Sequence, residues 1–305
     1  MSIKEHPPQL ESSRDEPVHV PVLLESVLDV LQPQPDNHYL DLTAGYGGHA
    51  RAILAHTTNY SESVLVDRDA FALKHIQDLV RLGARTLETD FVSAARQLID
   101  EGRTFDMILA DLGVSSPQLD REERGFSFRF DGPLDMRMDR REERTAADIV
   151  NGYSEQQLAS VIVRYGEEPR GRARRIAQAI VSERPIETTG QLADIVKNAT
   201  GRTGSKHHPA TRTFQALRIE LNRELELVSQ LLPLLPKLLN KGGRVAIISF
   251  HSLEDRLVKQ FFKEQAEAGY EAELELITKK PIDGSTEDVS HPRSRSAKLR
   301  AAVKK

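Results

Sequence analysis

An acidic residue followed by a glycine-rich turn is the most informative pattern in the chain. Asp41 ends a short apolar run, and the turn Leu42 to His49 that follows contains Gly45, Gly47 and Gly48. Glycines at this spacing let the backbone turn tightly, and a helix starting after the turn presents free N–H groups to a ligand. A carboxylate before the turn suits a cationic ligand group better than a pyrophosphate. S-adenosylmethionine carries an ammonium and a sulfonium, so the pattern makes it the first candidate ligand.

A second acid supports this interpretation. Gly45, Gly47 and Ala50 match a dinucleotide-binding fingerprint, which is a weak signal when it stands alone. The apolar run Ser63 to Val66 ends at Asp67, about 20 residues after the glycines, where an acid can bind ribose hydroxyls. Turn and acid together favour an adenosyl-containing cofactor. A plain strand-to-helix turn is the alternative.

The loop after the apolar run 105–111 contains the candidate catalytic residues. Asp111 is followed by the segment Leu112 to Gln118, which includes Ser115, Ser116 and a proline. Amino-group methyltransferases place a short polar loop with proline at the corresponding strand end, and its acceptors hold the NH2 group. Asp111, Ser115 and Ser116 are therefore candidates for holding an amine, and an ordinary strand-to-loop turn is the alternative.

An α/β fold is needed to bring these residues together. Four strand-like runs alternate with helical patterns, which predicts a parallel, doubly wound sheet with ligands at the carboxyl ends of its strands. Acids fall at all four strand ends: Asp41, Asp67, Asp90 and Asp111. The expected strands are about 38–42, 63–67, 86–90 and 105–111, and the expected helices about 20–31, 48–57, 70–82 and 92–101.

The alternation stops after residue 114. The apolar spacing from 115 to 215 is helical, which predicts an inserted helical domain within a main domain of 18–114 and 216–305, after a disordered tail at 1–17. The remaining expected elements are a helix near 214–239, a turn at 241–243, a strand at 244–249, a helix capped by Ser252 with Asp255, and closing antiparallel strands at 274–277 and 299–303.

Composition limits the compartment and the chemistry. No apolar run in the 305 residues approaches the roughly 18 needed to span a membrane, and residues 1–16 lack the apolar stretch of a signal peptide. We therefore expect a cytoplasmic protein. The chain has no cysteine, which excludes disulfides, thiolate metal sites and a thiol nucleophile. Adjacent His207 and His208 rarely ligate one ion, so we expect no metal.

Charge and aromatic residues indicate contact with a polyanion. The net charge of −4 argues against a uniformly basic protein, but the segments 195–219 and 289–305 contain lysines and arginines and no acid. The segment Arg124 to Phe130 interleaves three phenylalanines with two arginines, which could stack bases and hold phosphates or could anchor the insertion. His251 could face the crevice as an acid, base or polar contact, or be structural.

Longer blocks of the sequence carry a family pattern. Over about residues 18–303 the chain resembles the bacterial 16S ribosomal RNA (cytosine-N4)-methyltransferases, the MraW family. The blocks that carry this resemblance are His19 to Leu23, Asp41 to His49, Asp111 to Asp120, Arg124 to Phe128, Gly132 to Met138, Tyr165 to Glu168, His208 to Arg218, Ser249 to Arg256 and Pro292 to Ser296.

The resemblance implies both a fold and an activity. The fold is the Rossmann-like class I S-adenosylmethionine-dependent methyltransferase fold, with an inserted helical domain that recognises RNA. The activity is methyl transfer to N4 of a decoding-site (P-site) cytidine in 16S rRNA of the small ribosomal subunit, and a homodimer is left open. The assignment of Phe91 and Gln118 as cofactor contacts rests on the resemblance, with Phe91 stacked near the adenine. The expected cofactor-binding residues are Asp41, Gly45, Gly47, Gly48, His49, Asp67, Phe91, Asp111 and Gln118.

Lack of cysteine fits this reaction. Methylation at carbon 5 of cytosine usually needs a cysteine adduct, whereas an exocyclic amine can attack directly if acceptors hold its hydrogens and aim its lone pair.

Two alternatives remain open at the level of the sequence. One is a nicotinamide-dependent dehydrogenase with the same glycine turn, and the other is a non-catalytic RNA-binding or ribosome-assembly factor that uses only the basic segments.

Overall fold

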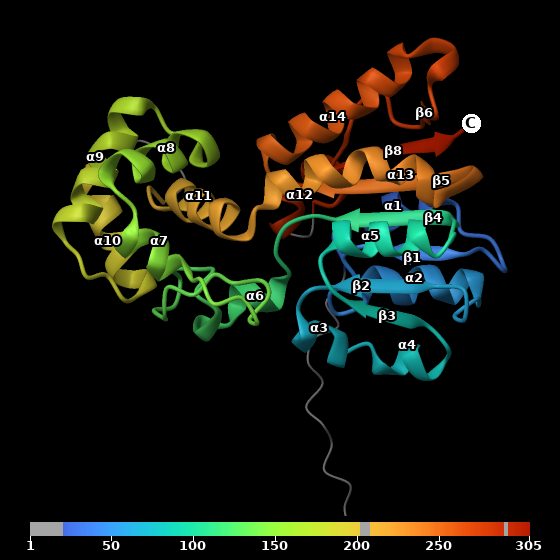
Figure 1. Cartoon of the computed structure of the whole chain (residues 1–305), viewed down its shortest axis with the longest axis horizontal. Helices are drawn as coiled ribbons and strands as arrows, with labels where there is room; N and C mark the ends of the chain where they lie inside the picture. The colour runs from blue at the N-terminus through green and yellow to red at the C-terminus, as the bar shows by residue number, and fades with distance from the viewer. Residues whose placement is uncertain (1–20, 202–207, 290–291) are drawn as a thin grey trace, which may run out of the picture.

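The computed structural model describes residues 21–201, 208–289 and 292–305 (Figure 1). The predicted tail at 1–17 and His207 lie outside these ranges. No helix in the described ranges is long and apolar enough to cross a lipid bilayer.

A mixed sheet forms the centre of the main domain. Its strands run in the order β3-β2-β1-β4-β5-β8-β6, with β7 paired to β8. The first five are parallel, and the pairs β5–β8, β6–β8 and β7–β8 are antiparallel, so the predicted doubly wound sheet with closing antiparallel strands is confirmed. The strands are β1 (Tyr39–Asp41), β2 (Val64–Asp67), β3 (Arg85–Glu88), β4 (Phe105–Asp111), β5 (Leu239–Ser249), β6 (Leu274–Leu276), β7 (Ile282–Asp283) and β8 (Lys298–Lys304).

Helices cover both faces of this sheet (Figure 1). Successive residues of a strand point to opposite faces, so β4 sends Ile108 into one apolar core and Leu109 into the other. This double burial explains why the strands read as continuous apolar runs. One face carries α1 (Leu24–Leu31), α2 (Gly48–Thr57), α3 (Ala70–Lys74) and α4 (Gln77–Arg81), and the other carries α5 (Phe91–Asp100), α12 (Glu224–Leu231), α13 (Leu235–Leu238) and α14 (Ser252–Glu267).

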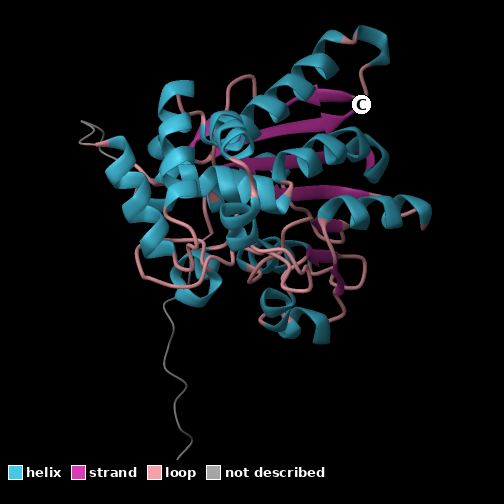
Figure 2. Ribbon diagram, turned by 60° about the vertical axis from the view of Figure 1, so that its left-hand side comes forward, coloured by secondary structure: helices cyan, strands magenta, loops and turns pink. Residues whose placement is uncertain are grey.

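A separate helical unit lies beside the main domain and has its own apolar core (Figure 2). Capping boxes at Thr145, Ser154 and Thr188 start three of its helices. Its core runs from Phe126 to Leu221, so the helix α11 crosses the boundary expected at residue 215. Its helices are α6 (Ser116–Asp120), α7 (Ala146–Gly152), α8 (Glu155–Gly166), α9 (Arg170–Ser182), α10 (Thr189–Thr200) and α11 (Thr211–Asn222).

Two long helices predicted from the sequence are broken. The segment 70–82 forms α3 and α4, and the segment 214–239 forms the end of α11, then α12 and α13. Arg223 separates α11 from α12 with a left-handed φ of 52°, and prolines at 233 and 236 then interrupt the regular helical hydrogen bonding.

Two local predictions around β5 are wrong in detail. The cap of α14 is His251 with Glu254, one residue before the predicted Ser252 with Asp255. The predicted turn at 241–243 lies inside β5, where the pairing with β4 shifts between Phe105 and Met107. The chain therefore bulges there and continues as one strand.

Candidate active site

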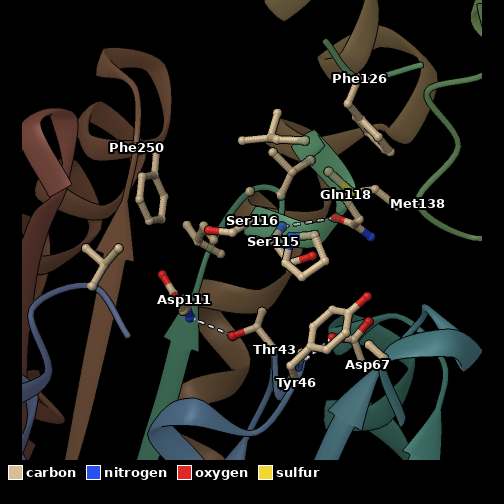
Figure 3. Close-up of a pocket in the computed structure, with 18 of the residues that line it drawn as sticks. Thr43, Tyr46, Asp67, Asp111, Ser115, Ser116, Gln118, Phe126, Met138 and Phe250 are labelled. Carbon is tan, nitrogen blue, oxygen red and sulfur yellow. Dashed lines mark hydrogen bonds between the residues drawn. The ribbon is translucent and has the colours of Figure 1, made fainter. Parts of the chain in front are cut away.

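The carboxyl ends of β1 and β4 border a cavity of about 1570 Å³. These strands are neighbours in the sheet, but the chain leaves β1 toward β2 and leaves β4 toward β5. A parallel sheet opens a ligand crevice at such a point. Figure 3 shows Asp111 between two ends of the cavity, with Tyr46 and Asp67 on one side and Phe250 on the other.

Asp41 lines the cavity but has both carboxylate oxygens engaged. The Tyr39 hydroxyl donates to Oδ2 (2.8 Å), and the backbone N–H of Thr43 donates to Oδ1 (3.1 Å). Burial raises the pKa of Asp41 to about 7, although both hydrogen bonds oppose the shift. Thr43 also accepts from the backbone N–H of Asp111 (2.6 Å). Asp41 therefore fixes the ends of β1 and β4 relative to each other.

Asp67 holds the glycine turn. Its carboxylate accepts from the backbone N–H groups of Gly45 and Asp69, each at 2.8 Å, and burial raises its pKa. Carboxylate oxygens keep a second lone pair after one such bond, so Asp67 can still accept from ligand hydroxyls. Asp90, at the next strand end, also lines the cavity but caps α5 by accepting from Val92 N (2.9 Å) and Ser93 N (3.0 Å).

The three glycines of the turn differ in their surroundings. Gly45 and Gly47 have positive φ values of 51° and 78°, which glycine adopts without strain. A Cβ at Gly47 would lie 2.5 Å from Ile76 Cγ2, and one at Gly48 would lie 2.6 Å from Pro21 Cγ. Gly45 and Gly48 line the cavity. Gly47 is therefore placed to shape the turn, and its contact with the cofactor stays a prediction.

His49 and Asp111 face each other beside the turn. His49 Nε2 lies 3.7 Å from Asp111 Oδ2. Burial lowers the pKa of His49 to about 4, whereas burial with the charges of Asp41 and Glu254 raises the pKa of Asp111 to about 8. At neutral pH the imidazole is neutral, so the two groups do not form an ion pair.

The loop after β4 is held by Gln118. Its Oε1 accepts from the backbone N–H of Ser115 (3.0 Å), and its Nε2 donates to Asp69 Oδ2 (2.9 Å). Ser115 and Ser116 both line the cavity, and the hydroxyl of Ser115 has no hydrogen-bond partner in the described ranges. With both ends of its amide engaged, Gln118 is placed to position Ser115.

Asp69 and Arg124 were missed by the sequence reasoning. They form an ion pair of 2.7 Å between side chains that are each 4% exposed. Asp69 also caps α3 by accepting from Phe71 N (3.0 Å). An acid that caps a helix gives no sign of a partner 55 residues away. The pair joins the helical unit to the cofactor side of the cavity.

Buried polar atoms without partners are concentrated in this cavity. Among its described lining residues they are both ring nitrogens of His49, Asp111 Oδ1, Ser115 Oγ, His251 Nε2 and Glu254 Oε1. A buried polar group left unpaired costs about 1–3 kcal/mol, so such groups are rare unless a ligand pairs them. The cavity is therefore shaped for a polar ligand that contacts these atoms.

Comparison with known proteins assigns the family. The sequence model of the MraW methylase family matches residues 16–305. The chain belongs to the MraW methylase family. It is 48% identical to "Ribosomal RNA small subunit methyltransferase H" of Cyanothece sp., covering 93% of this chain and 94% of that protein. The protein of that name from Acidobacterium capsulatum is 46% identical, covering 94% of this chain and 98% of that one.

A solved structure gives a more distant likeness. TrmN from Thermus thermophilus is 13% identical, with a TM-score of 0.43 that covers 93% of this chain and 48% of that one. The order of the strands and the family match together confirm the predicted Rossmann-like class I fold.

As an MraW methylase, the chain is a methyltransferase whose cofactor is S-adenosylmethionine. The cavity fits this group. Gly45, Asp67 and Phe91 line the end that includes Tyr46, and α2 starts there without a side-chain cap, so its N-terminus can face a carboxylate. We propose that Asp67 holds the ribose and that Gly48 and His49 approach the amino-acid portion.

The aromatic segment of this MraW methylase packs into the helical unit and also lines the cavity, through Phe126 and Phe128. Phe126 is buried, and Phe128 packs against Phe214 with 4.9 Å between ring centres. Phe130 is 49% exposed. Arg124, expected to hold phosphate, is occupied by Asp69. Among these phenylalanines Phe130 is the one placed to stack on a base outside the cavity.

Glu224, His251 and Glu254 form a cluster at the Phe250 end, with ligand atoms within 4.8 Å of one another. The bonding suits a hydrogen-bonding ligand better than a metal ion. Arg218 donates to both oxygens of Glu224 (2.8 and 2.9 Å), and His251 Nδ1 accepts from the backbone N–H of Glu254 (3.4 Å). Nε2 therefore carries the ring proton and is a donor.

Several cations of the two acid-free segments are paired with acids elsewhere in the fold. Arg218 is buried against Glu224, and Arg300 donates to Asp255 (2.7 Å). Arg293 pairs with Asp120, at 35% and 54% side-chain exposure, and lines the cavity mouth. These segments therefore offer less free positive charge than their composition suggests.

Proposed function

We propose that this enzyme transfers the methyl group of S-adenosylmethionine to N4 of a decoding-site (P-site) cytidine in 16S rRNA, in the cytoplasm. The observation that carries the proposal is the pair of unpartnered acceptors, Asp111 Oδ1 and Ser115 Oγ, at the end of β4. They lie between the cofactor end of the cavity and the end lined by Phe250 (Figure 3). Relatives named as small-subunit rRNA methyltransferases support the choice of RNA.

The residues around Asp111 suit a reaction at an exocyclic amine. S-adenosylmethionine, when bound, supplies an electrophilic methyl group. The amine lone pair of cytosine is delocalised into the ring, and acceptors for the two N–H hydrogens localise it. Asp111 and Ser115 supply such acceptors, and the Gln118 amide holds Ser115 in place. Orientation of this kind supplies much of the acceleration of a two-substrate reaction.

In its ionised form Asp111 can also take up the proton that the methylated amine releases. Its pKa, raised to about 8 by burial and by Asp41 and Glu254, makes it a better proton acceptor near neutral pH than an ordinary carboxylate. His49, whose pKa is lowered to about 4, stays neutral beside it and can donate or accept a hydrogen bond. The cytidine must be unpaired or extruded to reach these groups.

The test compares ribosomal RNA from cells with and without the gene. Nucleoside mass spectrometry should show N4-methylcytidine at one position of the small-subunit RNA, lost in the deletion strain and restored by the wild-type gene but not by Asp111→Ala. A methyl group on a ring carbon or on another base would reject the proposal. Equilibrium dialysis with NAD in place of S-adenosylmethionine should show no binding, and comparable affinity would favour a dehydrogenase.

A further inference from the structure

The Phe250 end of the cavity contains a hydrogen-bond donor beside an acceptor. His251 Nε2 and Glu254 Oε1 lie 3.2 Å apart on side chains that are 8% and 1% exposed. Neither atom makes a hydrogen bond within the part of the chain that the structure describes. Two buried polar atoms that both line the cavity and lack partners indicate that a ligand completes them.

Local bonds fix the chemical character of both atoms. The Nδ1 of His251 accepts from the backbone of α14, so Nε2–H is the donor. Glu254 Oε2 accepts from the backbone N–H of Phe250 (2.9 Å), which leaves Oε1 as the free acceptor. Although burial opposes it, the contact with His251, the charge of Arg218 and the backbone hydrogen bond from Phe250 hold the pKa of Glu254 below its usual value. We therefore treat the carboxylate as ionised.

A neighbouring donor and acceptor match the Watson–Crick edge of cytosine. Cytosine presents the N3 acceptor next to the N4 amino donor, and carboxylates are established acceptors for N4 hydrogens. We propose that His251 Nε2–H donates to N3 and that Glu254 Oε1 accepts the N4 hydrogen on the N3 side. The other N4 hydrogen then points to the acceptors at the end of β4, Asp111 with Ser115 beside it. This inference rests on the proposed function and names the residues that select the base.

The same pair rejects uracil. Uracil would present O4 to the Glu254 carboxylate and N3–H to the His251 N–H, so both contacts become repulsive. Sites built to pair a polar group discriminate strongly against an analogue that cannot pair it. The charges of Asp111 and Glu254 repel each other. An amino group can donate one hydrogen to each of them, which reduces this repulsion.

Two variants separate base selection from folding. Glu254→Gln replaces the ionised acceptor with a neutral amide of the same shape. His251→Ser removes the donor but keeps an N-cap, because serine caps helices well. Glu267→Gln on the same helix is the matched control, since its side chain is 64% exposed. The substrate is purified small ribosomal subunit from cells that lack the enzyme.

Both variants should lower kcat/KM for the subunit by about 10- to 100-fold, the range for a hydrogen bond to a charged group. Affinity for S-adenosylmethionine and the melting temperature should stay near those of the control. Subunits carrying a uridine at the target position offer no amine to methylate and act as competitors. They should compete with the normal substrate more effectively for Glu254→Gln than for the wild type, whose site rejects uracil.

The pH profile gives a readout that a structural role would not move. Asp111 faces Tyr39 and Asp41 from β1, His49 from α2 and Glu254 from α14. Glu254→Gln removes one like charge from this group, so the acid limb of kcat/KM should move to lower pH. The limb should stay in place for Glu267→Gln.

Two outcomes would overturn the inference, and they differ from failure of the proposed function. If the wild type makes N4-methylcytidine but Glu254→Gln keeps its kcat/KM within twofold and an unmoved acid limb, the base-reading role is wrong. If the variants lose activity only in proportion to a lower melting temperature or weaker cofactor binding, the residues are structural. If the wild type methylates no cytidine amine, the proposed function and this inference fail together.

Discussion

Asp111→Asn should make the protein more stable and far less active. The wild-type carboxyl has its pKa raised from 3.8 to about 8, mainly by burial, with Asp41 and Glu254 adding like charge. A carboxyl with a raised folded-state pKa contributes its full stability below pH 4 and loses it as the pH rises to 8. Asparagine does not titrate, so the variant should gain on the wild type across that window.

The magnitude follows from the shift. About four pKa units correspond to roughly 6 kcal/mol at pH values above 8, an upper bound. The side chain of Asp111 is still 26% exposed, so water in the cavity solvates the carboxylate and reduces the free-energy cost of its burial. Asparagine is also polar and loses some solvation there. We expect about 2 kcal/mol of extra stability near pH 8.5 and almost none near pH 4.

Urea unfolding at several pH values measures this difference, with exposed Asp100→Asn as the control. Methyl transfer by Asp111→Asn should fall by about 100-fold or more, as expected for loss of a group that acts at the reacting atoms. A stability difference that is absent at pH 8.5, or the same at every pH, would refute the argument that Asp111 is held protonated by its surroundings.

Three further variants test residues that shape the cavity or bind the cofactor. Arg124→Met should lower the free energy of unfolding by about 3–5 kcal/mol by leaving Asp69 buried and unpaired, and adding Asp69→Asn should recover much of it. Gly48→Ala should cost about 1–3 kcal/mol by melting analysis, because its Cβ would lie 2.6 Å from Pro21. Asp67→Asn should weaken S-adenosylmethionine binding about 10- to 100-fold by calorimetry, measured at a temperature where the variant is fully folded; unchanged affinity would remove Asp67 from the ribose site.

Strands β2 and β4 could be predicted because burial on both faces makes them mostly apolar. β4 was expected at 105–111 and is observed at Phe105–Asp111. Helix breaks were harder, since the left-handed residue that ends α11 is Arg223, a residue type with no preference for that conformation. The local sequence therefore predicts whether a segment is a helix or a strand better than it predicts the residues at which the segment begins and ends.

Charge was harder to interpret than periodicity. Arg218 and Arg300 belong to segments without acids, yet each is buried against an acid, Glu224 and Asp255 respectively. Asp255 is 45 residues from Arg300 along the chain. A run without acids shows that no partner lies inside the run, but folding brings partners from outside it. Net charge along a segment therefore overstates what remains for RNA.

Whether an acid at a strand end supports the fold or the chemistry is decided by individual oxygen atoms. The sequence placed Asp41 and Asp111 at equivalent positions, but Asp41 has both oxygens bonded within the chain, whereas Asp111 keeps Oδ1 without a partner in the described structure. Glu254 caps the start of α14 through Oε2. Its other oxygen faces the cavity, and no pattern of residue types could have shown that. Between Asp41 and Asp111 the unpaired atom, rather than the residue type, therefore indicates which carboxyl is available to a ligand. Asp67 combines both roles, because each of its oxygens accepts one backbone N–H and keeps a second lone pair.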